Sequence, residues 1–83
     1  MAYLPIFLDV TGRRCVVIGG GEIAARKVAS LLEVGADVVV VSPSLVDELA
    51  GVARRGRIQN LAREYEAGDM TGAALVYAAT DDT

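Results

Sequence analysis

The amino-acid sequence predicts an α/β domain built around a doubly wound parallel sheet. Short runs of β-branched residues alternate with segments of helical periodicity, and these runs are apolar almost throughout. Alternating strands and helices imply right-handed crossovers and therefore parallel strands. Continuous apolar runs are typical of strands that are buried on both faces of such a sheet. The natural order for the main strands is 3-2-1-4.

The first half of the chain contains the clearest elements. Residues 14–18 are predicted to form the first strand, and residues 38–41 the second. Between them, residues 22–34 are predicted to form a helix, because one apolar residue recurs on each turn. The residues on that face are Ala24, Val28, Leu31 and Leu32. Gly35 stands where a glycine commonly ends a helix.

The second half has weaker patterns. Residues 45–55 are predicted to form a second helix, which Gly56 closes, and residues 58–61 a short strand near an edge. Residues 64–72 are polar and rich in turn formers, with one helical turn expected around Asp69. Residues 74–78 are predicted to form a fourth buried strand. Before all of these, the apolar segment 3–10 is expected to be extended and to pack on the sheet.

The amino-acid composition excludes several classes of function. The 83 residues suffice for one small domain, and 53% hydrophobic content excludes a disordered acidic tail. A net charge of −3 argues against nucleic acid as the main partner, because such domains depend on basic surfaces. No metal site is predicted, since the chain has no His and only Cys15, expected to be buried. Without a signal peptide or an apolar run that spans a bilayer, a cytoplasmic protein with no membrane contact is expected.

A glycine motif follows the first predicted strand. Gly19, Gly20, Gly21 and Ala24 match the G-x-G-x-x-A form of the dinucleotide fingerprint. Gly19 allows the tight turn out of the strand, and Gly21 lets the backbone approach a pyrophosphate. Ala24 allows close packing of helix on sheet, while N–H groups of the first helical turn face the phosphates. The strand before and the helix after are the context that supports nucleotide binding.

The acid that commonly binds the adenosine ribose is missing from the end of the second strand. Ser42, Pro43 and Ser44 stand there instead, and either serine is a candidate for a ribose hydrogen bond. No arginine is present at that position to recruit a 2′-phosphate, so NADP gains no support. Arg26-Lys27 either approaches an anionic ligand or forms a solvated face. Asp81-Asp82 either acts at the switch point or only ends the fourth strand.

Taken together, these segments resemble precorrin-2 dehydrogenase, also found as the dehydrogenase/ferrochelatase module of siroheme synthase. The resemblance covers essentially the whole chain. It is carried by Leu4-Pro5-Ile6-Phe7, the run 17–27, Leu31-Leu32-x-x-Gly35-Ala36, Val40-Val41-Ser42-Pro43, Gly68-Asp69 and Ala78-Ala79-Thr80-Asp81-Asp82. It implies that residues 1–83 form the Rossmann-type NAD-binding domain of a longer enzyme, of which this chain is a truncated part. In this family the missing ribose acid is the usual pattern.

The resemblance also implies the reaction and the site. The full protein is expected to oxidise precorrin-2 to sirohydrochlorin with NAD⁺ as a cytoplasmic homodimer, followed in some members by Fe²⁺ insertion. Gly21, Glu22 and Ile23 would hold the cofactor's phosphates, together with Gly19 and Gly20. Gly19, Gly20 and Gly21 are called the glycine turn below. Ser42-Pro43-Ser44 would lie by the adenosine, and Thr80-Asp81 by the nicotinamide. The family's catalytic acid lies in a later Asn-Val-x-Asp segment, so no catalytic residue is predicted within these 83 residues.

Two other classes of protein share part of this sequence pattern. A non-catalytic NAD-sensing regulatory module would have the same glycine turn, but it needs neither Arg26-Lys27 nor the Thr80-Asp81-Asp82 ending. A transferase dependent on S-adenosylmethionine normally carries an acid after the second strand, where this chain has Val41-Ser42. The sequence therefore favours the dehydrogenase, with the NAD sensor as the alternative.

Overall fold

The computed structural model describes residues 9–79, so the apolar residues 3–8 and the candidate residues Thr80, Asp81 and Asp82 lie outside the described part. The elements in chain order are β1 (Arg14–Ile18), α1 (Glu22–Glu33), β2 (Asp37–Val41), α2 (Asp47–Arg54), β3 (Gln59–Leu61), the short 3-10 helix η1 (Ala67–Met70) and β4 (Leu75–Ala78). Strands and helices alternate through α2, as the periodicity predicts.

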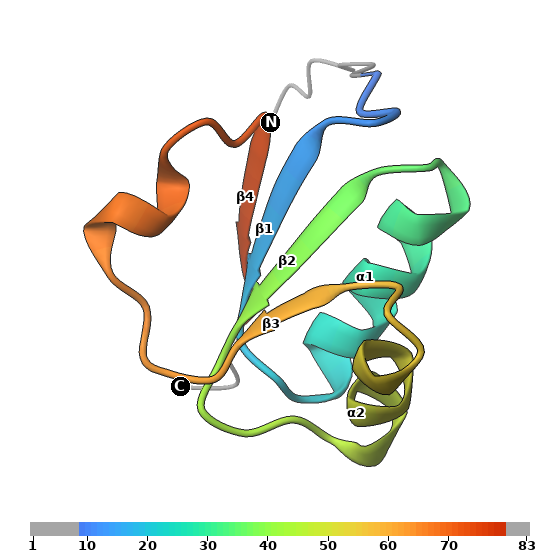
Figure 1. Cartoon of the computed structure of the whole chain (residues 1–83), viewed down its shortest axis with the longest axis vertical. Helices are drawn as coiled ribbons and strands as arrows, with labels where there is room; N and C mark the ends of the chain where they lie inside the picture. The colour runs from blue at the N-terminus through green and yellow to red at the C-terminus, as the bar shows by residue number, and fades with distance from the viewer. Residues whose placement is uncertain (1–8, 80–83) are drawn as a thin grey trace, which may run out of the picture.

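The four strands form one parallel sheet in the order β3-β2-β1-β4, which confirms the predicted topology (Figure 1). Val17 of β1 lies level with Val40 of β2 and with Tyr77 of β4. Because the chain leaves β1 toward β2 on one side and β4 joins on the other, a topological switch point lies between β1 and β4. Ligands of open α/β sheets bind at the carboxyl ends of the strands beside such a point.

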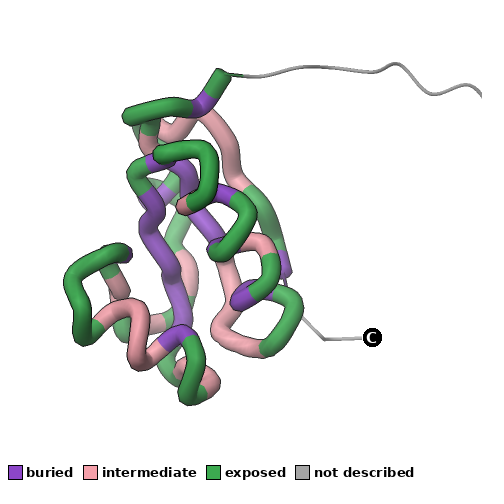
Figure 2. The backbone as a smooth tube through the Cα atoms, turned by 90° about the vertical axis from the view of Figure 1, so that its right-hand side faces the viewer, coloured by how far each residue is buried: buried purple, intermediate pink, exposed green. Residues whose placement is uncertain are grey.

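Two apolar clusters pack on opposite faces of the sheet. The larger one joins inward residues of β1 and β2 to α1 and α2, with Val17, Val28, Val40 and Leu49 each at most 1% exposed. The smaller one is built around Val16, Val39 and Val41. Figure 1 shows α1 and α2 on one side of the sheet and the β3–β4 connection on the other. In Figure 2 the buried stretches lie in the middle of the molecule and the surrounding loops are exposed.

The end of α1 follows the predicted glycine cap. Gly35 adopts φ +78°, a left-handed conformation that disfavours side chains, and its N–H donates to Leu32 O. The N–H of Ala36 donates to Leu31 O, which completes a Schellman motif. This turn sends the chain directly into β2. Neither α1 nor any other helix in the described part of the chain has the length and apolar character to cross a membrane.

Cys15 is completely buried in the larger cluster, as expected for a small hydrophobic residue. Burial raises the pKa of its thiol, and the nearby Arg13 opposes that rise only in part. A buried thiol with a raised pKa is chemically inert. Cys15 therefore serves packing.

The prediction of a fourth buried strand is wrong. In β4, Leu75 and Val76 are half-buried, while Tyr77 and Ala78 are exposed, Tyr77 at 36%. The reason is the position of β4 at the edge of the sheet, where β1 is its one neighbouring strand among residues 9–79. An apolar run in the sequence does not reveal how many neighbours its strand has.

The second helix begins two residues later than the apolar pattern predicts, at Asp47. Leu45 and Val46 remain partly buried, but Val46 is the extended N-cap of α2, with φ −63° and ψ 158°. Its N–H donates to Gly20 O over 2.8 Å, so the loop after β2 is tied to the glycine turn before the helix starts. This tertiary interaction overrides the local apolar pattern.

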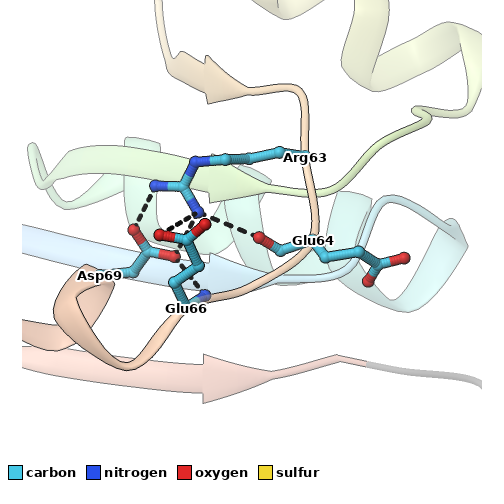
Figure 3. Close-up of polar contacts among 4 residues, drawn as sticks. All are labelled: Arg63, Glu64, Glu66 and Asp69. Atoms are coloured by element: carbon cyan, nitrogen blue, oxygen red, sulfur yellow. Dashed lines mark hydrogen bonds and ion pairs between the residues drawn. The ribbon is translucent and has the colours of Figure 1, made fainter.

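The β3–β4 connection is closed by an ion pair between Arg63 and Asp69 (Figure 3). Two guanidinium nitrogens of Arg63 donate to the two carboxylate oxygens of Asp69, over 2.9 and 2.5 Å. The N–H of Glu66 donates to the same carboxylate over 2.7 Å, at the start of η1, the helical turn expected around Asp69. This clamp shapes the connection that packs on the smaller cluster through Tyr65 and Ala73.

The clamp predicts a pH dependence of stability. Hydrogen bonds from Arg63 and from the Glu66 N–H lower the pKa of Asp69 to about 2. Because the folded value lies below the unfolded value of about 3.9, the stabilisation is present above that value. It is lost as pH falls toward 2. In urea unfolding, Asp69→Asn is expected to lower the midpoint at pH 7 and to have a smaller effect at pH 2.5.

Glu64→Gln is the matched control, because Glu64 contributes only its backbone carbonyl to Arg63 and its side chain lies outside the clamp. It is expected to change the midpoint little at either pH. An Asp69→Asn effect of the same size at pH 7 and at pH 2.5 would show that the carboxylate charge does not hold the connection.

Candidate nucleotide-binding site

The residues that follow β1, β2 and β4 meet at the carboxyl edge of the sheet. Each is tied by its backbone N–H to the end of a neighbouring strand. The hydrogen bonds are Gly19 N–H to Val41 O (3.0 Å), Ser42 N–H to Leu61 O (3.1 Å) and Ala79 N–H to Ile18 O (2.8 Å). The parallel topology therefore brings the glycine turn, the 42–44 loop and the end of β4 to one edge of the sheet.

The glycine turn has the backbone of a β-strand that bends sharply into a helix. Gly19 adopts φ +124°, which a residue with a side chain rarely does. Gly21 is the N-cap of α1 with φ −92°, and no side chain in the described part of the chain caps this helix. Its first-turn N–H groups and the helix dipole therefore form an environment suited to an anion.

Gly20 has a role that sequence reasoning missed. A Cβ at Gly20 would overlap the backbone carbonyl oxygen of Ser44 and lie 2.8 Å from the Ser42 Oγ. The loop after β2 thus packs directly on Gly20, where a side chain would otherwise stand. In the fingerprint Gly20 stands at a position with no assigned role, and here its lack of a side chain makes room for the protein's own chain.

Ser42 is 8% exposed, and its hydroxyl is engaged within the loop. It donates to Ser44 O over 2.7 Å and accepts from Ser44 N–H over 3.4 Å. Pro43 and Ser44 are exposed beside it. Of the two serines considered for the ribose, Ser44 is therefore the accessible one, and Ser42 shapes the loop.

The two basic residues of α1 have different surroundings. Lys27 is half-buried and its Nζ lies 4.6 Å from the centre of the Tyr77 ring on β4, a cation–π contact. Arg26 is exposed and faces a hollow between the N-terminal turns of α1 and α2. Lys27 therefore links the helix to the edge strand, a structural role that differs from both contact with an anionic ligand and a solvated face.

Glu22 and Ile23 form the exposed start of α1, Ile23 at 45%. Glu22 lies in the first turn, where a carboxylate interacts favourably with the helix dipole. A phosphate at this turn would use the backbone N–H groups. Among residues 9–79, no group of three or more His, Cys, Asp or Glu side chains is arranged to hold a metal ion.

The sheet order, the switch point and the glycine turn at the carboxyl edge define the class of Rossmann-type domains. A protein-family model described as "Putative NAD(P)-binding" matches residues 6–83. A solved structure titled "SirC, precorrin-2 dehydrogenase" superposes with a TM-score of 0.88 at 29% identity, covering 96% of this chain and 40% of that one.

Curated relatives point to the same family. This chain is 52% identical over 82 residues to a siroheme synthase of Methylobacillus flagellatus and 49% identical over 86 residues to one of Nitrosospira multiformis. The matches cover 99% of this chain and 18% of each relative. The chain belongs to the family of N-terminal NAD(P)-binding domains of siroheme synthase and precorrin-2 dehydrogenase.

Proposed function

We propose that this chain binds NAD⁺ at the glycine turn, as the cofactor-binding part of a cytoplasmic, homodimeric precorrin-2 dehydrogenase. The observation that carries the proposal is the N-terminus of α1 behind Gly19, Gly20 and Gly21, which no side chain among residues 9–79 caps, at the switch point of the sheet. Backbone N–H groups and glycines at a helix start are the chemistry that recognises a dinucleotide pyrophosphate.

The residues present fit the cofactor in different ways. Gly21 would allow close approach of the pyrophosphate, and the N–H groups of Glu22 and Ile23 would donate to it. The exposed Pro43 and Ser44 would lie along the adenosine, on the loop that Ser42 shapes. Bound NAD⁺ supplies the hydride acceptor. By the family resemblance, we also propose that Thr80 and Asp81 contact the nicotinamide side of the cofactor.

The substrate class comes from the relatives. A precorrin-2 dehydrogenase and siroheme synthases match almost all of this chain, which supports oxidation of precorrin-2 to sirohydrochlorin by the complete protein. Iron insertion is the second reaction that the resemblance implies for some members. The chain spans 18% to 40% of these relatives. In this proposal its own contribution to the reaction is to bind and orient the cofactor.

Calorimetric titration of the chain with NAD⁺ tests the proposal. We expect saturable binding of one NAD⁺ per chain, with a dissociation constant at or below about 1 mM, the upper range of ordinary enzyme affinities. ADP-ribose is expected to compete for the same site. No heat above dilution at NAD⁺ concentrations well beyond that range would contradict a competent cofactor site in this chain.

A further inference from the structure

A hollow of about 370 Å³ lies beside the glycine turn, between the first turns of α1 and α2. Its lining residues are Glu22, Ala25, Arg26, Val46, Asp47 and Glu48. The two walls are joined at their base, because the N–H of Val46 donates to Gly20 O over 2.8 Å. The hollow therefore keeps a fixed relation to the turn at which the cofactor is proposed to bind.

The charges around this hollow are unequal. Glu22, Asp47 and Glu48 bring three carboxylates, against one guanidinium from Arg26. Among residues 9–79, no ion pair within 4.0 Å ties Arg26 to any of them. The opening between the two helices is thus an anionic environment at neutral pH.

The hollow lies next to the loop that follows β2, where the adenosine end of the cofactor is proposed to bind. In Rossmann-type sites the residue at the end of the second strand meets the adenosine ribose, and an acid there favours NAD over NADP. In this chain Ser42 stands at that point with its hydroxyl engaged, and its loop runs over Gly20 directly into Asp47 and Glu48. The nearest acids after β2 are therefore those of the first turn of α2.

We propose that Asp47 and Glu48 make this site select NAD⁺ over NADP⁺ by repelling the 2′-phosphate of the adenosine ribose. The inference rests on the proposed function and adds the residues that determine its cofactor specificity. A phosphate monoester carries about −1.5 to −2 charges at pH 7. Near the carboxylates it is disfavoured, whereas the uncharged ribose hydroxyls of NAD⁺ are not. Glu22 adds to the same field from the opposite wall.

The test compares dissociation constants for NAD⁺ and NADP⁺ in the unchanged chain and in the double variant Asp47→Asn/Glu48→Gln. At low ionic strength the variant is expected to bind NADP⁺ about fivefold to twentyfold more tightly, with NAD⁺ affinity within about twofold. The gain should shrink at about 0.5 M salt, because the charges are exposed and screened. A role in folding alone would change both affinities together.

Glu33→Gln is the matched control, since it removes one carboxylate at the far end of α1, roughly 16 Å along the helix axis from Glu22. It is expected to leave the NADP⁺/NAD⁺ ratio unchanged. An unaltered ratio in the double variant, or an equal shift in Glu33→Gln, overturns the specificity role while NAD⁺ binding stands. Absence of binding of either nucleotide to the unchanged chain overturns the proposed function and this inference with it.

Discussion

Gly20→Ala is expected to destabilise the domain by about 3 kcal/mol, at the upper end of the usual penalty for overfilling a packed site. The new methyl group would overlap the Ser44 carbonyl oxygen and crowd the Ser42 Oγ. The overlapped atom is backbone, so the whole loop after β2 has to move. The hydrogen bond from Val46 to Gly20 and those between Ser42 and Ser44 would be disturbed together.

Urea unfolding of Gly20→Ala beside Gly68→Ala measures this effect. A Cβ at Gly68 meets nothing within 4 Å, and Gly68 has no positive φ, so that substitution is expected to change stability by less than about 0.5 kcal/mol. For a domain of this length, about 3 kcal/mol is a large share of the total stability. Equal stabilities of the two variants would show that the loop does not rest on Gly20.

Gly21→Val is expected to weaken NAD⁺ binding at least about a hundredfold while the domain stays folded. The φ of −92° at Gly21 is open to residues with side chains, so the backbone carries no strain from the change. The branched side chain would stand at the N-cap of α1, where the pyrophosphate is proposed to approach. The effect is steric exclusion of the cofactor, in contrast to the structural role of Gly20.

Titration calorimetry together with thermal unfolding separates the two effects. Ala29→Val is the matched control, because it adds a branched side chain to an exposed position of the same helix. It is expected to bind NAD⁺ like the unchanged chain. Undiminished NAD⁺ affinity in Gly21→Val would mean that the cofactor does not approach this turn.

Local patterns were sufficient to predict the sheet and its first crossover. The apolar residues that recur on each turn of α1, the Gly35 cap and the apolar runs of β1 and β2 are patterns that extend over only a few residues each. The gathering of Gly19 and Ser42 at one edge then follows from parallel topology alone. These parts of the fold and of the site required no knowledge of distant contacts.

The remaining features depend on interactions between distant segments. The start of α2 is set by Val46 bonding to Gly20, and the exposure of Tyr77 by the edge position of β4. Neither is encoded in a periodic pattern. The Arg63–Asp69 clamp arises within a polar segment, where many pairings are equally compatible with the sequence. The packing of the loop after β2 on Gly20 has no signal in the sequence, because the dinucleotide fingerprint assigns no role to the position of Gly20.

Binding of the cofactor at the glycine turn is tested most directly by mapping backbone amide shifts of the ¹⁵N-labelled chain during NAD⁺ titration. We predict the largest changes at residues 19–23 and at Ser44, because these amides line the proposed path of the pyrophosphate and adenosine. The connection around Arg63 and Asp69 should respond little. Changes concentrated in that connection, with the glycine turn unaffected, would contradict cofactor binding at this turn.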